Sequence, residues 1–159
     1  FNLIEYENIS FDSCNGIFFN GSDCFASKGF IFSRVNFSGK SFDLYNTHLD
    51  AGNSTKDKIV RAKQIKKLST YIKNKSDNQT ILICGDFNIN YSNEKSILDS
   101  FMKDLSLLPY KVKLENSIDY IFFRNSTNAK VKIKELDILE AYNGLSDHNP
   151  IGIEIEIIK

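Results

Sequence analysis

The strictest constraint on the fold is a change of hydrophobic period along the chain. In Pro150–Lys159, isoleucine occupies every second position from Ile151 to Ile157, with glycine or glutamate between. This period of two predicts a half-buried strand. In Ser54–Asn74 the period is instead three to four, carried by Ile59, Ala62, Ile65, Leu68 and Ile72. That spacing predicts an amphipathic helix, so both kinds of element are expected in one chain.

Other segments extend this pattern and place helices between strands. Turn chemistry in Asn36–Lys40 predicts that the strands on either side form a hairpin. A second helix is predicted over Glu94–Leu105. The remaining strands are predicted at Gly29–Val35, Phe42–Tyr45, Thr80–Cys84, Ile118–Phe123 and Ala129–Leu139. We therefore predict the α/β (α+β) class, with 159 residues forming a single domain.

Charge and hydropathy exclude some classes of protein. The 20 basic and 20 acidic residues give a formal net charge of zero, which argues against binding to nucleic acid by bulk charge. The helix at 54–74 nevertheless carries several lysines, for which a nucleic-acid surface is one interpretation and a solvated face the default. They are Lys56, Lys58, Lys63, Lys66 and Lys67. No apolar run approaches the ~20 residues of a membrane helix.

The three cysteines leave the cellular compartment open. Cys84 ends an apolar run and is expected to be a small buried core residue. Cys14 and Cys24 lie in a loop-like stretch, where a disulfide and two free thiols are equal alternatives, because the deciding Cα separation is not in the sequence. Asn-x-Ser/Thr triplets also fit a secreted or extracytoplasmic protein, although an asparagine-rich composition and a cytoplasmic location are the alternative. The triplets begin at Asn8, Asn20, Asn36, Asn53, Asn74, Asn78, Asn90 and Asn125.

Polar clusters follow the predicted strand ends, where sheet enzymes place reactive groups. The clusters are Asn46–Asp50, Gly85–Asn88, Ser117–Tyr120 and Leu145–Pro150, and they include both histidines of the chain.

Two of these clusters suggest specific chemistry. Asp86 and Asn88 would point to one face if the strand continues, with Phe87 on the other. A carboxylate beside a carboxamide suits Mg²⁺ and is poor for zinc. Asp119 has apolar neighbours and would be expensive to bury unpaired, so we expect it to orient His148.

Taken together and in order, the four clusters resemble the endonuclease/exonuclease/phosphatase superfamily. The resemblance implies a DNase I-like four-layer sandwich, in which two mainly antiparallel sheets are flanked by helices. It implies that this chain forms the C-terminal portion of that sandwich. Within the superfamily, Ala26–Phe30, Thr47–Ala51 and Arg61–Gln64 look most like the bacterial sphingomyelinases.

The resemblance also implies roles in phosphodiester hydrolysis. His148, paired with Asp119, would handle the proton or the phosphoryl oxygen. Asp86 would orient or deprotonate the attacking water, with Asn88 beside it. His48 would hydrogen-bond the phosphate.

A metal site and weaker substrate contacts complete the implied machinery. Asp147 would join Asp86 and Asn88 at a metal site for Mg²⁺ or another hard divalent ion such as Mn²⁺. Asn46 and Lys28 are the weaker candidates for substrate binding.

The sequence departs from the family pattern at one position. The family's principal metal ligand is a glutamate preceded by asparagine, located before the hairpin that this chain enters at Gly29. Glu5 and Glu7 lie too near that hairpin to match. We expect the principal ligand upstream of Phe1, in a missing N-terminal segment or on a second chain. A degenerate domain that no longer catalyses is the alternative.

The motifs and the resemblance suggest three alternative functions. The leading hypothesis is a sphingomyelinase-like, metal-dependent phosphodiesterase acting on phospholipid head groups, with peripheral membrane contact. The alternatives are a nuclease of the same superfamily and a non-catalytic binding domain. Aromatic residues in the irregular N-terminal region form either a membrane-facing patch or part of the core: Phe11, Phe18, Phe19 and Phe25.

Overall fold

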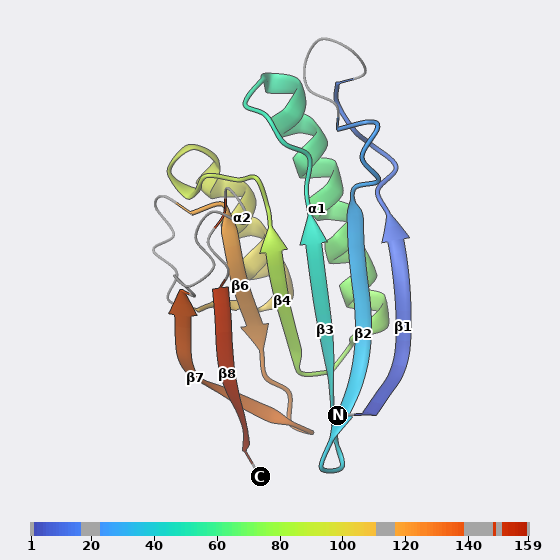
Figure 1. The fold of residues 1–159 in the computed structure, drawn as a ribbon, viewed down its shortest axis with the longest axis vertical. Helices are drawn as coiled ribbons and strands as arrows, with labels where there is room; N and C mark the ends of the chain where they lie inside the picture. Colours follow the sequence, from blue (N-terminus) through green and yellow to red (C-terminus); the bar gives the residue numbers. More distant parts are fainter. Residues whose placement is uncertain (1, 17–22, 111–116, 139–147, 149–150, 159) are drawn as a thin grey trace.

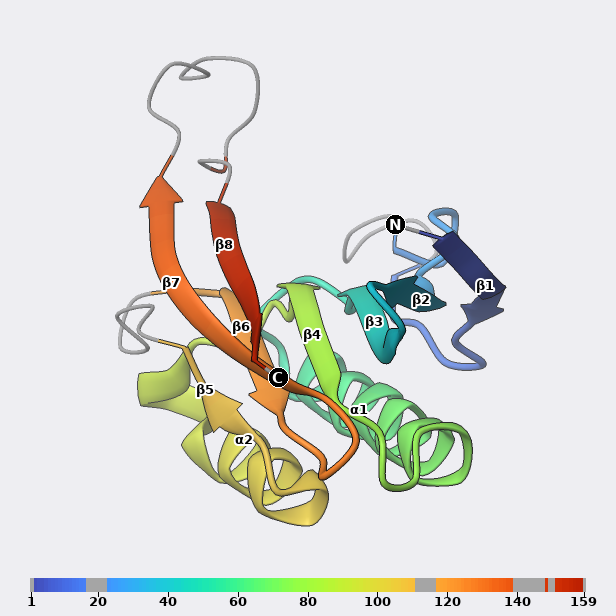
Figure 2. The ribbon, with the colours of Figure 1, turned by 90° about the horizontal axis from the view of Figure 1, so that it is seen from below.

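A six-stranded sheet, covered on one face by two helices, dominates the computed structural model of the chain (Figures 1 and 2). The structure describes residues 2–16, 23–110, 117–138 (backbone only from 135), 148 and 151–158. The sheet has the order β1-β2-β3-β4-β6-β5, and β7 pairs with β8 in a separate two-stranded sheet. The elements are β1 (Asn2–Ser10), β2 (Gly29–Phe37), β3 (Lys40–His48), α1 (Thr55–Lys75), β4 (Ile81–Asp86), α2 (Tyr91–Leu105), β5 (Leu108–Pro109), β6 (Asp119–Arg124), β7 (Lys130–Ile138) and β8 (Ile151–Ile158).

The connections bring distant polar residues to one edge of the sheet. Strands β1, β2 and β3 pair antiparallel, and β2 with β3 forms the predicted hairpin. Helix α1 then carries the chain back, so that β4 runs parallel to β3 and β6 runs antiparallel to β4. The C-terminal ends of β3 and β4 therefore lie beside the start of β6.

Local capping explains where the helices begin. The Ser54 hydroxyl accepts a hydrogen bond from the Asp57 backbone N–H, and the Asp57 carboxylate accepts one from the Ser54 backbone N–H. This capping box makes Ser54 the N-cap of α1. Helix α2 begins three residues earlier than the predicted Glu94, because the Asn90 side chain caps it by accepting from the Ser92 backbone N–H.

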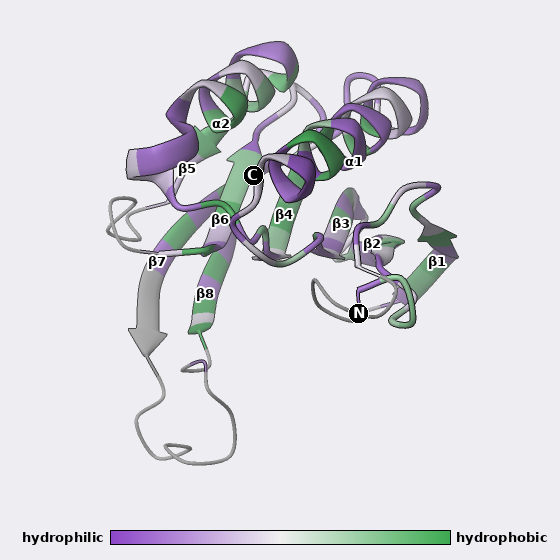
Figure 3. Cartoon of the chain, turned by 90° about the horizontal axis from the view of Figure 1, so that it is seen from above, coloured by the Kyte–Doolittle hydropathy of each residue, from purple (hydrophilic) through white to green (hydrophobic). Residues whose placement is uncertain are grey.

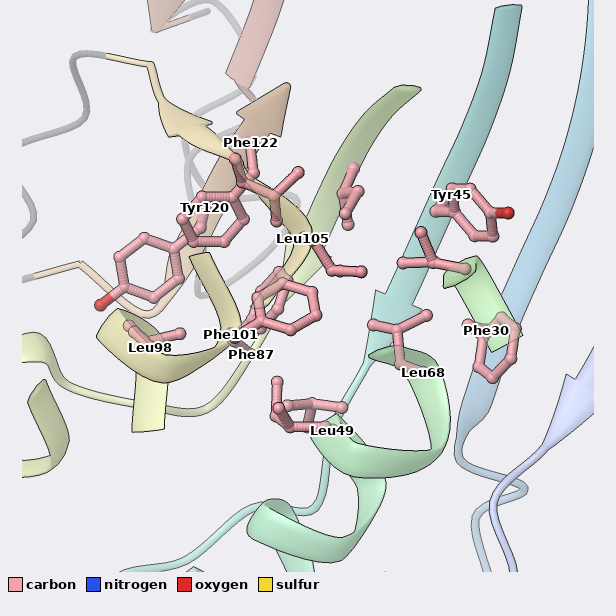
Figure 4. Close-up of a cluster of buried hydrophobic side chains, with 14 of the residues drawn as sticks. Phe30, Tyr45, Leu49, Leu68, Phe87, Leu98, Phe101, Leu105, Tyr120 and Phe122 are labelled. Carbon is pink, nitrogen blue, oxygen red and sulfur yellow. The ribbon is translucent and has the colours of Figure 1, made fainter. Parts of the chain in front are cut away.

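An aromatic core between the sheet and the helices holds the strands in place (Figure 4). Phe87 and Phe122 meet edge to face, with ring centroids 5.3 Å apart, and Phe101 of α2 packs on both. Leu68 of α1 is fully buried in the same core. Burial of each such side chain stabilises the fold by about 1.5–3 kcal/mol, so this face of the sheet is rigidly supported.

The structure tests the expectations for the three cysteines and for the aromatic residues of the N-terminal region. Cys14 and Cys24 form a disulfide. Cys84 is half-buried rather than fully buried, because it faces the side of the sheet that the helices leave open. Phe11 packs against the core, whereas Phe25 is 67% exposed. Phe18 and Phe19 lie outside the described residues, and within the described part no helix is long and apolar enough to cross a membrane.

Candidate functional site

Three candidate site residues lie side by side in one row across the sheet. The strand register pairs His48 of β3 with Asp86 of β4, and Asp86 with Asp119 of β6. Their neighbours Thr47 and Tyr120 are buried. Because side chains alternate along a strand, the row faces the side of the sheet away from the helices.

Gly85 allows this row to form. Its φ of +139° is in a region that residues with a Cβ rarely adopt, and a Cβ there would lie 1.9 Å from the Thr47 carbonyl oxygen. A glycine therefore permits the close approach of β3 and β4. As a result, His48 Nε2 lies 3.5 Å from Asp86 Oδ2.

His148 approaches the row from a segment far away in the sequence. Its Nδ1 lies 2.8 Å from Asp119 Oδ2, so the structure contains the pair that the sequence suggested. Partial burial raises the pKa of the Asp119 carboxyl above its usual value, and the nearby charge of Asp86 raises it further. His148 opposes both effects by stabilising the carboxylate.

The donor set fits a hard divalent cation. One ligand atom each from Asp86, Asp119 and His148 lies within 4.8 Å of the others. Two carboxylates suit Mg²⁺ or Mn²⁺, and a cation between them would offset the repulsion that raises the Asp119 pKa. Asp147, the further predicted ligand, lies outside the described residues.

Asn88 takes a different position from the one predicted. Strand β4 ends at Asp86, and Asn88 has a left-handed φ of 50°, so the strand does not continue to Asn88 and the condition for both side chains to share one face is not met. The Asn88 backbone N–H donates to Asp86 Oδ1 at 2.7 Å, and its Nδ2 donates to the Leu49 carbonyl at 2.9 Å. Asn88 thus orients the Asp86 carboxylate and ties it to the end of β3.

The two weaker candidates both border His48. Lys28 Nζ lies 2.6 Å from His48 Nε2 and 3.4 Å from the Asp23 carboxylate. Asn46 is exposed and donates from Nδ2 to the Cys84 sulfur at 3.4 Å. Lys28, Asn46 and His48 line one shallow hollow of about 330 Å³.

Sequence reasoning named Arg61–Gln64 only as part of the resemblance and missed the role of these residues in fixing the loop after His48. The guanidinium of Arg61 is fully buried and donates to the Asp50 and Gly52 carbonyls and, at 2.7 Å, to the Glu94 carboxylate. Gln64 Oε1 accepts from the Asp50 backbone N–H at 2.8 Å. A signal was present, because Arg61 falls in the apolar phase of α1, four residues before a buried isoleucine.

Glu5 and Glu7 lie away from the row. Both are ion-paired with Lys75 at the end of α1, with Nζ–O distances of 2.5 and 2.6 Å. Strand β1 therefore adds neither glutamate to the group formed by Asp86, Asp119 and His148.

Two curated proteins resemble this chain in sequence. A sphingomyelinase C of Bacillus cereus is 34% identical over 86 residues, which cover 50% of this chain and 26% of that protein. A phospholipase C of Staphylococcus aureus is 26% identical over 170 residues, covering 82% of this chain and 52% of that protein. The chain thus spans at most about half the length of these relatives.

A solved structure shows the same fold. A double mutant of Staphylococcus aureus beta toxin with bound magnesium ions superimposes with a TM-score of 0.62 at 18% identity, covering 98% of this chain and 61% of the toxin. The predicted α/β fold of DNase I-like type is thereby confirmed. The sequence profile of the endonuclease/exonuclease/phosphatase family 2 matches residues 4–116. The chain therefore belongs to the endonuclease/exonuclease/phosphatase family.

Proposed function

We propose that this protein is a divalent-metal-dependent phosphodiester hydrolase acting on phospholipid head groups, like the sphingomyelinases. The observation that carries the proposal is the row of His48, Asp86 and Asp119, completed by the hydrogen bond from Asp119 to His148. Family membership and the names of the two sequence relatives support the reaction and the substrate class.

Each residue has a role suited to its contacts. His148, held in orientation by Asp119, exchanges a proton with the substrate or hydrogen-bonds a phosphoryl oxygen. Asp86, whose carboxylate accepts from the Asn88 backbone, orients the attacking water. His48 hydrogen-bonds the phosphate, and Lys28, which lies against it, adds positive charge there.

Asp86 would hold the metal, with Asp147 as a further ligand and the Asp119–His148 pair close beside it. When bound, Mg²⁺ or Mn²⁺ supplies Lewis-acid stabilisation of charge on the phosphoryl oxygens. Asn88 would support the site by fixing the Asp86 carboxylate. The disulfide between Cys14 and Cys24 supports a secreted or extracytoplasmic location, since disulfides persist in oxidising compartments.

Hydrolysis assays with matched substrates test the proposal. The full-length protein is incubated with sphingomyelin vesicles and with plasmid DNA, each with Mg²⁺ and with EDTA. We expect Mg²⁺-dependent release of phosphocholine, which His148→Ala lowers by a factor of about 10²–10⁴, the range for one acid–base group. Lys132→Ala, at an exposed position of β7, is the control and should retain the activity.

Other outcomes of these assays would contradict the proposal. Mg²⁺-dependent cleavage of DNA without release of phosphocholine would replace this proposal with the nuclease alternative. Turnover that persists in EDTA would show that the reaction needs no divalent metal. Turnover that persists in His148→Ala would show that His148 is not required. No metal-dependent cleavage of either substrate would favour the non-catalytic alternative.

A further inference from the structure

The zero net charge of the chain conceals a strongly basic helix. Within Thr55–Lys75 there are eight basic residues and one acidic residue, Asp57, which gives α1 a net charge of 8 − 1 = +7. Helix α2 has two basic and three acidic residues, a net charge of 2 − 3 = −1. Positive charge is therefore concentrated on α1, on the layer opposite the candidate site (Figure 2).

A groove runs between α1 and α2. Both helices carry hydrophilic and hydrophobic residues along their length (Figure 3). The groove has a volume of about 790 Å³. Ile65 and Phe101 contribute to its apolar floor, while lysines and hydroxyl groups from both helices form its sides. These polar residues are Lys66, Ser69, Thr70, Lys73, Ser96, Ser100 and Lys103.

Some of the lysines around this groove are already neutralised and others are not. Lys73 pairs with Asp104, the carboxylate of the groove, which also accepts a hydrogen bond from Ser69. Across the described residues, Lys66 and Lys103, the other two lysines of the groove lining, have no carboxylate within ion-pairing distance. The groove therefore presents uncompensated positive charge beside hydroxyl donors.

We propose that the α1–α2 groove binds a linear phosphate polymer. Lysine ammonium groups and serine hydroxyls are ordinary ligands of phosphate oxygens, and a concave groove follows a chain better than a flat membrane. On α1 only Ile59 is a large exposed apolar side chain, which is too little to insert into lipid. Phe101 is buried, so the groove offers no aromatic platform for bases.

Because the groove lies on the helix layer, its occupant leaves the row of His48, Asp86 and Asp119 open. The groove would tether the protein to a polyanion while the opposite face remains available. This inference does not depend on the proposed hydrolysis, and its test uses binding alone.

Binding of fluorescently labelled inorganic polyphosphate, followed by anisotropy, tests the proposal. The variant combines Lys66→Gln and Lys103→Gln, which preserve helix propensity. A matched control combines Lys130→Gln and Lys132→Gln, which remove the same charge from exposed positions of β7. At about 50 mM salt we expect the groove variant to lose at least about tenfold in affinity and about two units of salt slope, and the control to lose less than about twofold.

Three results would overturn the proposal. Equal losses in the two variants would mean that total charge, not the groove, attracts the polymer. Tighter binding of single-stranded DNA than of polyphosphate with equal charge would show that bases are recognised. Lysine-dependent binding to vesicles containing phosphatidylserine, without binding to polyphosphate, would make a membrane the partner. Circular dichroism checks that both variants remain folded.

Discussion

Strand β3 carries a polar cluster near each end, and the two clusters differ in how completely their groups are paired. Near its start, Asp43 is fully buried and accepts from Arg34 at 2.7 and 2.8 Å and from the Ser76 hydroxyl at 2.5 Å. At its end, the site row is half-exposed and leaves carboxylate oxygens available. A saturated buried cluster stabilises the fold, whereas an accessible one of like charges can bind a ligand.

Replacing Asp43 should have the largest effect on the free energy of unfolding. Asp43→Ala leaves the Arg34 guanidinium without its main partner, so we expect about 3–5 kcal/mol of lost stability, as for other broken buried pairs. Urea unfolding followed by circular dichroism measures this loss. Asp119→Asn is the comparison variant and should change stability by less than about 1 kcal/mol. A comparable loss in both variants would contradict the distinction between the clusters.

A more conservative substitution tests the geometry of the ion pair between Arg34 and Asp43. Arg34→Lys keeps the charge but loses the two parallel hydrogen bonds to Asp43. We expect a loss of about 2 kcal/mol in the free energy of unfolding. A stability equal to that of the parent would show that charge alone matters there.

In the site row, the expected effect is on metal binding and not on folding. Asp86→Asn removes a charged ligand, so the affinity for Mn²⁺, measured by calorimetry, should fall at least about tenfold, or about 1.4 kcal/mol. Asp77→Asn, at an exposed position after α1, is the matched control and should bind normally. Unchanged affinity in Asp86→Asn would remove Asp86 from the metal site.

The smallest predicted effect on stability concerns the carboxyl group of Asp50. It is fully buried, and burial raises the pKa of its carboxyl above the usual value, with Asp23 and Asp57 adding to the rise. The folded state therefore binds this proton more tightly than the unfolded state, so stability is lost as pH rises through the raised pKa.

Replacing this carboxyl should remove that loss. Asp50→Asn should be slightly more stable than the parent at pH 7, and the gain should shrink as the pH falls towards the usual pKa of an aspartate. Thermal unfolding across this pH range measures it. A gain that is the same at every pH would assign the effect to packing instead of ionisation.

Periodicity and capping determined much of this protein in advance. The alternation in 151–157, the spacing in 54–74 and the Ser54 cap depend on local backbone geometry, which neighbouring residues set directly. The four ordered motifs also identified the family. For these features, the sequence contains the physical cause.

Contacts between distant segments could only be seen in the folded chain. The register that aligns His48, Asp86 and Asp119 depends on Gly85 packing against β3, and the role of Arg61 depends on the loop and helix that meet it. The disulfide and the turn of Asn88 towards Leu49 likewise required the spatial separation of their partners. Local patterns fix the elements, but hydrogen bonds and charges act through space, so tertiary structure decides which polar groups meet.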